Sequence, residues 1–347
     1  MRTRLLGKTG IHVSEVCLGA MMYGAAGNKD HDDAVRQIHH ALDAGVNFID
    51  TADVYSTGES EEIVAKALAG GRRDEVVLAT KFFAPMGKDP NHGGGSRRWI
   101  VREVENSLRR LQTGYIDLYQ CHRFPDNQDP EETLGALTDL QRAGKIRVFG
   151  SSMWPAERIV EAQWTSERRG LARLRCEQAS YSLLARDIER SVLPTCDRYG
   201  MGVITYSPLA GGWLSGKYRE AKDFTPDTRI VRMANRWGAF DPEQEINQQR
   251  LELVRRFQVV ADTAGIALPH LATAFVLEHP ALSAVIIGPR TFDQLTDSLA
   301  AAEVRLDTAT LDAIDQIVAP GTNVNPIDPS SAPPSVYKAA LRRRSGK

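Results

Sequence analysis

The sequence has no apolar run that approaches the about 20 residues needed to span a lipid bilayer. Its N-terminus, Met1-Arg2-Thr3-Arg4-Leu5-Leu6-Gly7, lacks the apolar segment of a secretory signal. These two absences argue against a membrane or secreted protein. We therefore expect a soluble, cytoplasmic protein with no membrane partner.

Cysteine is scarce and shows no paired spacing. The four cysteines are Cys17, Cys121, Cys176 and Cys196, and none forms a Cys-x-x-Cys pair. An even number of cysteines does not by itself predict a disulfide framework in a chain of 347 residues. We expect reduced thiols. Cys121 lies beside His122, and there we favour a buried packing thiol over a nucleophile.

An excess of charge of either sign is also missing. The chain has 43 Lys and Arg against 44 Asp and Glu, which gives a formal net charge of -1. Arg342-Arg343-Arg344 is the one basic run, and we interpret it as a solvated tail. The balance gives no electrostatic argument for a nucleic-acid partner.

A glycine-rich dinucleotide fingerprint is absent from the first strand–helix junction. No Gly-x-Gly-x-x-Gly follows the first expected strand, so a Rossmann crossover is not supported. Tyr218-Arg219-Glu220-Ala221-Lys222 has the Tyr-x-x-x-Lys spacing of short-chain dehydrogenases. The glycine-rich turn which that reaction needs is missing, and we set this motif aside.

What the sequence does contain is a regular alternation of helical and strand patterns from about residue 30 onward. Such alternation predicts a parallel sheet, and eight units match the closed (β/α)8 TIM barrel of the α/β class. No linker divides the chain, so we expect one domain over residues 1–347. The expected strands are Glu15–Leu18, Val46–Ile49, Val76–Ala79, Tyr115–Tyr119, Ile146–Phe149, Leu174–Glu177, Val203–Tyr206 and Ala284–Ile287. The expected helices begin near Asp32 and after an N-cap at Ser96, or cover Glu59–Leu68, Glu131–Ala143, Ala156–Trp164, Asp187–Tyr199, Ile246–Ala264, Leu268–Leu277 and Phe292–Ala301.

Three segments lie outside this repeat. The first eleven residues, with Lys8-Thr9-Gly10 as a turn, predict a β-hairpin that plugs the barrel floor. Residues 207–243, after the seventh strand, form a long segment of little periodicity that we expect to serve cofactor and substrate. Residues 319–347 hold several prolines and predict a partly flexible C-terminal extension.

Four polar side chains follow three of the expected strands. Asp50 and Tyr55 come after Val46–Ile49, Lys81 after Val76–Ala79 and His122 after Tyr115–Tyr119. The carboxyl ends of barrel strands carry the chemistry of this fold. We therefore expect one acid, one phenol, one amine and one imidazole in a single mouth, where they can protonate a carbonyl oxygen.

Six segments in matching order carry a resemblance that covers nearly the whole chain. They are Leu18-Gly19-Ala20-Met21-Met22-Tyr23-Gly24, Gly45-Val46-Asn47-Phe48-Ile49-Asp50-Thr51-Ala52-Asp53-Val54-Tyr55, Gly58-Glu59-Ser60-Glu61, Thr80-Lys81, Tyr115-Ile116-Asp117-Leu118-Tyr119-Gln120-Cys121-His122 and Tyr206-Ser207-Pro208-Leu209. On these residues the sequence resembles the aldo-keto reductase superfamily, in the branch near bacterial glyceraldehyde-phosphate reductases and potassium-channel β subunits.

The resemblance implies a catalytic tetrad of Asp50, Tyr55, Lys81 and His122. Tyr55 would be the general acid that protonates the oxygen after hydride transfer. A free phenol has a pKa of about 10, and we expect the Lys81 cation to lower it. Asp50 would hold Lys81, and His122 would orient the substrate oxygen.

The resemblance also implies NADPH bound across the barrel mouth. The expected cofactor residues are Gly19, Met21, Asp50, Ser152, Gln178, Tyr206, Ser207, Leu209, Gly211, Lys217, Gly288, Arg290, Gln294 and Ser298. Arg290 is the candidate for the 2′-phosphate, with a surface charge at a helix start as the alternative. Met153 and Ser298 depart from the family pattern, since an amide is common at the first position and Asn or Asp at the second.

The sequence gives fewer signals for the substrate site than for the cofactor site. Tyr23, Phe82, Arg123, Trp154 and Trp213 follow strand ends and would line it. Arg123 would either meet an anionic substrate or form a surface salt bridge.

Three functions compete on the sequence alone. The first is an NADPH-dependent carbonyl reductase of small-molecule aldehydes or ketones, the second an NADP(H)-binding regulatory subunit resembling channel β subunits. The third, a metal-dependent barrel hydrolase, is disfavoured because only Asp50 and His122 qualify as ligands. The physiological substrate is left open, and the resemblance allows a homo-oligomer.

Overall fold

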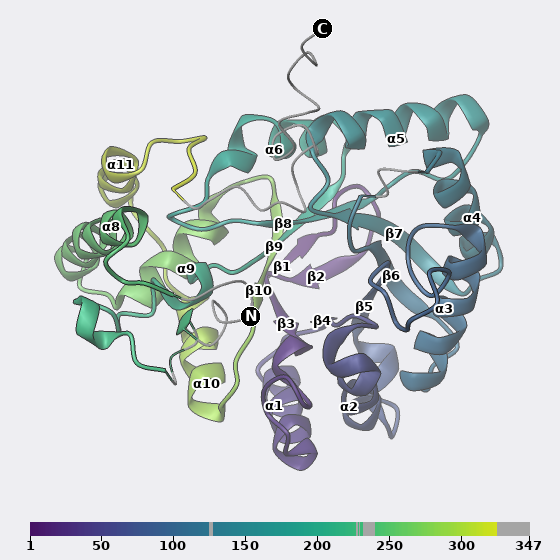
Figure 1. The fold of residues 1–347 in the computed structure, drawn as a ribbon, viewed down its shortest axis with the longest axis horizontal. Helices are drawn as coiled ribbons and strands as arrows, with labels where there is room; N and C mark the ends of the chain where they lie inside the picture. Colours follow the sequence, from purple (N-terminus) through teal and green to yellow (C-terminus); the bar gives the residue numbers. More distant parts are fainter. Residues whose placement is uncertain (125–127, 227, 229, 232–239, 325–347) are drawn as a thin grey trace, which may run out of the picture.

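The computed structural model describes residues 1–124, 128–226, 228, 230–231 and 240–324. Its centre is a closed barrel of eight parallel strands, with helices around it (Figure 1). The barrel strands are β3 (Val16–Gly19), β4 (Phe48–Asp50), β5 (Val77–Phe82), β6 (Ile116–Cys121), β7 (Ile146–Ser152), β8 (Cys176–Ser180), β9 (Gly202–Tyr206) and β10 (Leu282–Ile287). Strand β10 pairs with both β3 and β9 and so closes the cylinder. The predicted TIM barrel is confirmed.

Most helices begin and end close to the predicted positions, but the helix Thr308–Ile317 was not predicted and the helix from Ala156 extends to Arg169 instead of ending at Trp164. The helices are α1 (His31–Asp43), α2 (Glu59–Leu68), α3 (Arg97–Arg110), α4 (Pro130–Arg142), α5 (Ala156–Arg169), α6 (Val192–Tyr199), α8 (Glu245–Thr263), α9 (Leu268–Glu278), α10 (Phe292–Ala301) and α11 (Thr308–Ile317). Ser96 caps α3, since its side chain accepts a hydrogen bond from the Trp99 N–H. Helix α6 ends at Gly200, whose φ is 65°.

One predicted helix is shorter than expected. The pattern over Asp187–Tyr199 indicated a continuous helix, but Asp187–Arg190 forms a 3-10 turn and α6 begins only at Val192. Pro194 has no N–H to donate to the turn before it, and proline is tolerated only in the first turn of a helix. The helix therefore begins just before this residue.

The predicted N-terminal hairpin is present at the floor of the barrel. Strands β1 (Thr3–Leu5) and β2 (His12–Ser14) pair antiparallel, so the hairpin extends a little beyond the eleven residues expected. The Lys8 N–H donates to the Gly200 carbonyl at 2.8 Å, next to the start of β9. Gly7 has φ 57°, and an added Cβ would lie 2.3 Å from the backbone nitrogen of Gly202. Only glycine allows the hairpin to approach the strand this closely.

The barrel interior has an apolar floor and a polar upper layer. Side chains alternate between the two faces of a strand, so residues two apart point the same way. A small core cluster inside the barrel includes Phe48, Ala79, Leu118 and Cys176, together with Leu6 of the hairpin. Two residues after the first four of these stand Asp50, Lys81, Gln120 and Gln178, all at most 3% exposed. The four strands thus place these polar side chains in one layer above the apolar side chains that fill the lower half of the barrel.

The segments outside the barrel repeat are described in part. In residues 207–243, positions 227, 229 and 232–239 lie outside the described residues. The same holds for residues 325–347 of the C-terminal extension, while the Val324 N–H bonds the Leu184 carbonyl at 2.9 Å. No single helix of the described chain combines the length and apolarity of a membrane span; α8 and α9 reach them only as a pair bent by 88°.

Candidate active site

Lys81 is the centre of the candidate site. Its ammonium donates to Asp50 Oδ2 at 2.5 Å, to the Thr51 carbonyl at 2.8 Å and to the Tyr55 hydroxyl at 3.3 Å. The Lys81 side chain is fully buried, and that of Asp50 is 3% exposed. Asp50 is the last residue of β4 and Lys81 lies inside β5 rather than after it, because both strands extend beyond their predicted ends.

Two glutamines that the sequence reasoning did not place in this group complete the surroundings of Asp50. Gln120 Nε2 and Gln178 Nε2 donate to Asp50 Oδ1 at 3.1 and 2.9 Å. Gln178 was predicted as a cofactor residue, whereas Gln120 was missed. The signal for Gln120 was available, since it lies on β6 two residues before His122, which directly follows that strand, and so faces the same side. The carboxylate is held from three sides.

The charge states of Lys81 and Tyr55 follow from their burial and from each other. Burial alone would lower the pKa of Lys81, but Asp50 and Tyr55 outweigh it, and the pKa is raised above its usual value. Burial also raises the pKa of Tyr55, and the Lys81 cation offsets only part of this increase. Lys81 thus lowers the pKa of the phenol as expected, but in the protein alone burial has the larger effect. Tyr55 holds its proton at neutral pH.

His122 lies beside the phenol. Its ring packs edge-on against Tyr55 with 5.8 Å between the centroids, and its backbone N–H bonds the Phe82 carbonyl at 2.9 Å. Burial, then Lys81 and Arg123, lower the pKa of His122 well below its usual value, so the ring is neutral. Nδ1 is buried and has no hydrogen-bond partner in the described part of the chain. Buried polar atoms without a hydrogen-bond partner are rare in folded proteins. A molecule bound at this rim would supply the missing partner.

Backbone strain gathers at the same end of the barrel. In the described residues, the non-glycine positions with positive φ are Ser56, Thr57, Phe83, Gln112, Met153, Ser207 and Ala210. All but Gln112 follow the carboxyl end of a barrel strand. Such conformations are costly and cluster at functional sites. The rim that carries the tetrad is thus also the strained rim.

Side chains predicted to hold a nicotinamide ring lie at the ends of β7, β8 and β9. Ser152 and Gln178 are paired in the sheet register and nearly fully buried. Because Gln178 Nε2 bonds Asp50, its carbonyl oxygen is the end left to accept from a carboxamide. The Tyr206 hydroxyl donates to Met153 Sδ at 2.9 Å. Met153, the departure from the family pattern, therefore holds the predicted stacking ring.

The residues predicted for the phosphates and adenosine form two loops after β9 and β10. Lys217 and Arg290 are exposed, and neither makes an ion pair within the described ranges. An added Cβ on Gly211 or Gly288 would meet nothing within 4 Å. Two cations without an ion-pair partner, close to glycines whose backbone is sterically accessible, fit the phosphate groups of an extended cofactor.

Other predicted cofactor residues in these loops have local partners. Gln294 Oε1 accepts from the Arg290 N–H at 2.9 Å and so shapes the start of α10. The Ala210 N–H bonds the Ser207 carbonyl at 2.8 Å, and the Leu214 N–H bonds the Leu209 carbonyl at 3.2 Å. Ser298 lies half-buried on α10.

Gly19 has a packing reason of its own. An added Cβ would lie 2.7 Å from Ile286 Cγ2 and 3.1 Å from the Ile287 carbonyl, so β10 leaves no room for a side chain. Met21, in the 3-10 turn Ala20–Met22, is half-buried at the end of β3.

The residues predicted to line a substrate site divide into two groups. Tyr23 and Phe82 are fully buried in the core, and the structure gives them no surface that a substrate can reach. Trp154 is also buried and packs edge-on against Phe124, with centroids 5.0 Å apart. Arg123 is half-buried beside Tyr55 and His122 and donates to the His122 carbonyl at 2.6 Å.

Trp213 is buried in the long segment after β9. Its ring packs against Phe224 and Phe240, with centroids 5.1 and 6.1 Å away. The three rings form a small aromatic cluster that stabilises this segment.

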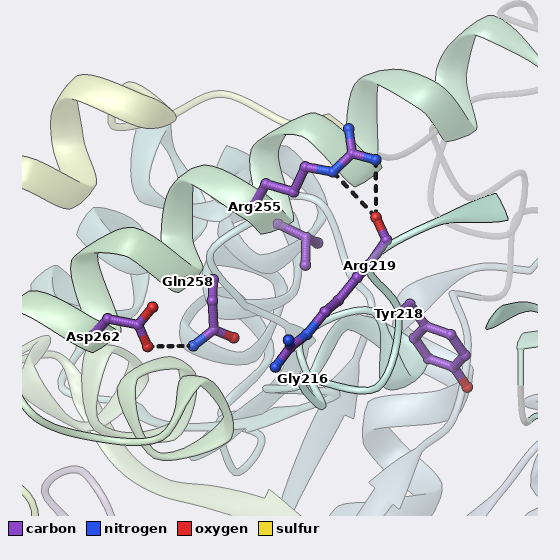
Figure 2. A pocket seen from close by; sticks show the side chains of 7 residues that line it. Gly216, Tyr218, Arg219, Arg255, Gln258 and Asp262 are labelled. Carbon is purple, nitrogen blue, oxygen red and sulfur yellow. Dashed lines mark hydrogen bonds between the residues drawn. The ribbon is translucent and has the colours of Figure 1, made fainter. Parts of the chain in front are cut away.

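A separate hollow of about 210 Å³ lies between the segment after β9 and helix α8 (Figure 2). Gly216, Tyr218, Arg219, Val254, Arg255, Gln258 and Asp262 line it, and none of the tetrad does. Arg255 donates from Nε and Nη2 to the Arg219 carbonyl at 3.1 and 2.9 Å. Helix α8 thereby fixes the stretch that follows Lys217. No group of three or more potential metal-binding side chains occurs in the residues that the structure covers.

Comparison with known proteins agrees with this geometry. The model of the aldo/keto reductase family matches residues 15–319. An uncharacterized oxidoreductase of Bacillus subtilis, YrpG, is 39% identical over 91% of this chain and 96% of its own length. Probable voltage-gated potassium channel β subunits of rice and Arabidopsis thaliana are each 35% identical over 92% of this chain and 96% and 97% of their own lengths. The chain therefore belongs to the aldo/keto reductase family and is an NAD(P)-dependent oxidoreductase.

Proposed function

We propose that this protein is an NADPH-dependent carbonyl reductase that reduces an aldehyde or ketone to the alcohol. The observation that carries the proposal is the buried Lys81 ammonium, which bonds both Asp50 and the Tyr55 hydroxyl at the rim of the barrel. The nicotinamide cofactor supplies the hydride when it is bound. The protein's own residues supply the proton and position the substrate oxygen.

Tyr55 is the general acid in this proposal. Its pKa is raised by burial, so the hydroxyl carries the proton that the substrate oxygen needs. Once the proton leaves, the phenolate lies 3.3 Å from the Lys81 ammonium, which stabilises the new charge. Asp50 keeps Lys81 charged and in place.

His122 orients the substrate oxygen. Because its pKa is low, the ring is neutral and presents one N–H donor without competing for the proton of Tyr55. A neutral donor beside the developing oxyanion favours the transition state over the ground state.

We propose that the cofactor lies across the strained rim. Ser152 and the Gln178 carbonyl would hold the carboxamide, and Tyr206 would stack on the nicotinamide. The other proposed contacts are Gly19, Met21, Asp50, Ser207, Leu209, Gly211, Lys217, Gly288, Gln294 and Ser298. Arg290 favours NADPH over NADH, because a guanidinium can bind a 2′-phosphate through two parallel hydrogen bonds.

The names of the rice and Arabidopsis relatives favour a second candidate, an NADP(H)-binding regulatory subunit with little turnover. Both functions need the cofactor, and only the first needs steady reduction of a carbonyl. We also propose a cytoplasmic location, which is supported by four buried cysteines that are all free thiols.

An absorbance assay of NADPH with a carbonyl panel distinguishes the candidates. The panel contains a simple aldehyde, a sugar phosphate, a keto-sugar and a bulky ketone. Steady loss of NADPH with one of them supports the reductase. Tight NADPH binding without turnover supports the regulatory subunit, and a protein that binds no NADPH refutes both.

A further inference from the structure

Glu177 is a fully buried acid that the mechanism above does not use. It lies on β8 directly before Gln178, and its side chain faces away from the barrel interior because neighbouring residues of a strand alternate. Oε2 accepts a hydrogen bond from the Ser151 hydroxyl at 2.5 Å, and Oε1 accepts from the Trp154 N–H at 3.1 Å. Between them, the Met153 N–H donates to the backbone carbonyl of Gln178 at 2.9 Å. One side chain thus binds both sides of the turn that follows β7.

That turn bears on the proposed nicotinamide site through two contacts and one strained backbone conformation. Ser152 lies between the residues that Glu177 binds and is paired with Gln178 in the register. Met153 has φ 60°, a conformation that a non-glycine residue adopts only when its surroundings enforce it. Met153 Sδ in turn accepts the hydrogen bond from Tyr206. Fixing the turn therefore fixes Ser152 and Tyr206 together.

We propose that Glu177 is a positioning residue that holds the turn Ser151–Trp154 so that Ser152 and Tyr206 meet the nicotinamide end of the cofactor. The inference rests on the proposed function and adds to it the residue that shapes this end of the site. Glu177 does not touch the cofactor, and it has no part at the adenosine end. Its loss weakens binding of the nicotinamide end alone.

The surroundings of Glu177 indicate which replacement preserves its role. The titratable groups on the same side of the sheet as Glu177 are the thiols of Cys121 and Cys196, while the neighbouring thiol of Cys176 points into the barrel. All three thiols are neutral because burial raises their pKa, and no cation pairs with Glu177 in the described chain. Burial raises the pKa of Glu177 to about 8, so the side chain is mostly a neutral acid at pH 7. In the neutral form Oε2 carries the proton, so the direction of its bond with Ser151 reverses and Oε2 donates to Ser151 Oγ, while Oε1 still accepts from the Trp154 N–H. Glutamine can make the same bonds with Nε2 and Oε1.

The test compares E177Q with E177L by calorimetric titration with two probes. NADPH reports the whole cofactor, and adenosine 2′,5′-bisphosphate reports the adenosine end alone. We expect E177L to raise the Kd for NADPH about tenfold or more, because the Trp154 N–H loses its acceptor and the Ser151 hydroxyl loses its partner. The Kd for the bisphosphate stays within about twofold, and E177Q stays within about twofold of wild type for both probes. Thermal unfolding checks that each variant is folded.

Ser151→Ala is the second variant, in case E177L does not fold. It removes one partner of Glu177 and leaves the Trp154 N–H bonded to the carboxyl group, so we expect the Kd for NADPH to rise about threefold with the bisphosphate unaffected. Equal losses for both probes, no loss in E177L or S151A, or an E177Q as impaired as E177L would overturn the inference. Wild-type protein that binds neither probe would remove the proposed function as well, and the two failures are thereby distinct.

Discussion

Replacing Lys81 with methionine removes the cation that pairs with Asp50, and no other described residue supplies one there. The substitution keeps most of the side chain's length and leaves the Asp50 carboxylate, 3% exposed, with hydrogen bonds from Gln120 and Gln178 alone. Removing one partner of a buried ion pair costs about 3–5 kcal/mol, because the remaining charge is neither hydrated nor paired. We expect K81M to lose about this much of the free energy of unfolding at pH 7.

The double variant D50N/K81M separates the unpaired charge from the loss of packing. Asparagine is close in shape to aspartate but neutral, so no charge is left buried in the double variant. Replacing both partners of a buried pair is often close to neutral. We expect the free energy of unfolding of the double variant to exceed that of K81M by at least about 2 kcal/mol, although it carries one more substitution.

Urea unfolding followed by tryptophan fluorescence measures both differences, provided the slope of the transition is unchanged. The reasoning is refuted if K81M loses less than about 1 kcal/mol, or if D50N/K81M is as unstable as K81M. Either result would mean that the ion pair does not hold the site in the way that its distances suggest.

Three further predictions concern other parts of the chain. R290A raises the Kd for NADPH at least about tenfold and leaves that for NADH nearly unchanged, as measured by fluorescence titration; equal effects on both would exclude a 2′-phosphate contact. Because burial raises the pKa of Glu177 to about 8, its contribution to stability is fully present below the unfolded pKa of about 4.5 and is lost as the pH rises towards 8. The stability of wild type relative to E177Q therefore declines across this range in urea unfolding, and parallel profiles would contradict the raised pKa. S96A loses about 1 kcal/mol of stability, since the Trp99 N–H at the start of α3 loses its cap; a loss below about 0.3 kcal/mol would show that the cap is unimportant.

The barrel was predictable because its signals are local and repeated. Strands and helices alternate with apolar positions at two different periods, and helix ends carry caps such as Ser96 and Gly200. Strand ends were less predictable. The apolar pattern stops where β4 and β5 turn polar, yet the backbone pairing continues through Asp50 and Lys81. Pairing, and not side-chain polarity, decides where a strand ends.

The residues of the candidate site were easier to predict from the sequence than their pKa values. The four tetrad side chains were identifiable from strand ends and motifs, whereas the raised pKa of Tyr55 depends on burial that no motif reports. Gln120 was missed although its spacing from His122 was a usable signal, whereas Glu177 was missed because its role arises from contacts with the turn after another strand. Tyr23 and Phe82 were placed near the substrate because they follow strand ends, but a strand end does not state which way a side chain points.

The most direct measurement of the central claim is the rate of carbonyl reduction by the Tyr55→Phe variant, taken together with its affinity for NADPH. Phenylalanine removes only the hydroxyl that Lys81 bonds at 3.3 Å. We predict that NADPH binding stays within a few-fold of wild type and that the rate with the best aldehyde of the panel falls by at least about 10². A variant that binds NADPH normally and reduces the aldehyde at nearly the wild-type rate would contradict the assignment of Tyr55 as the acid.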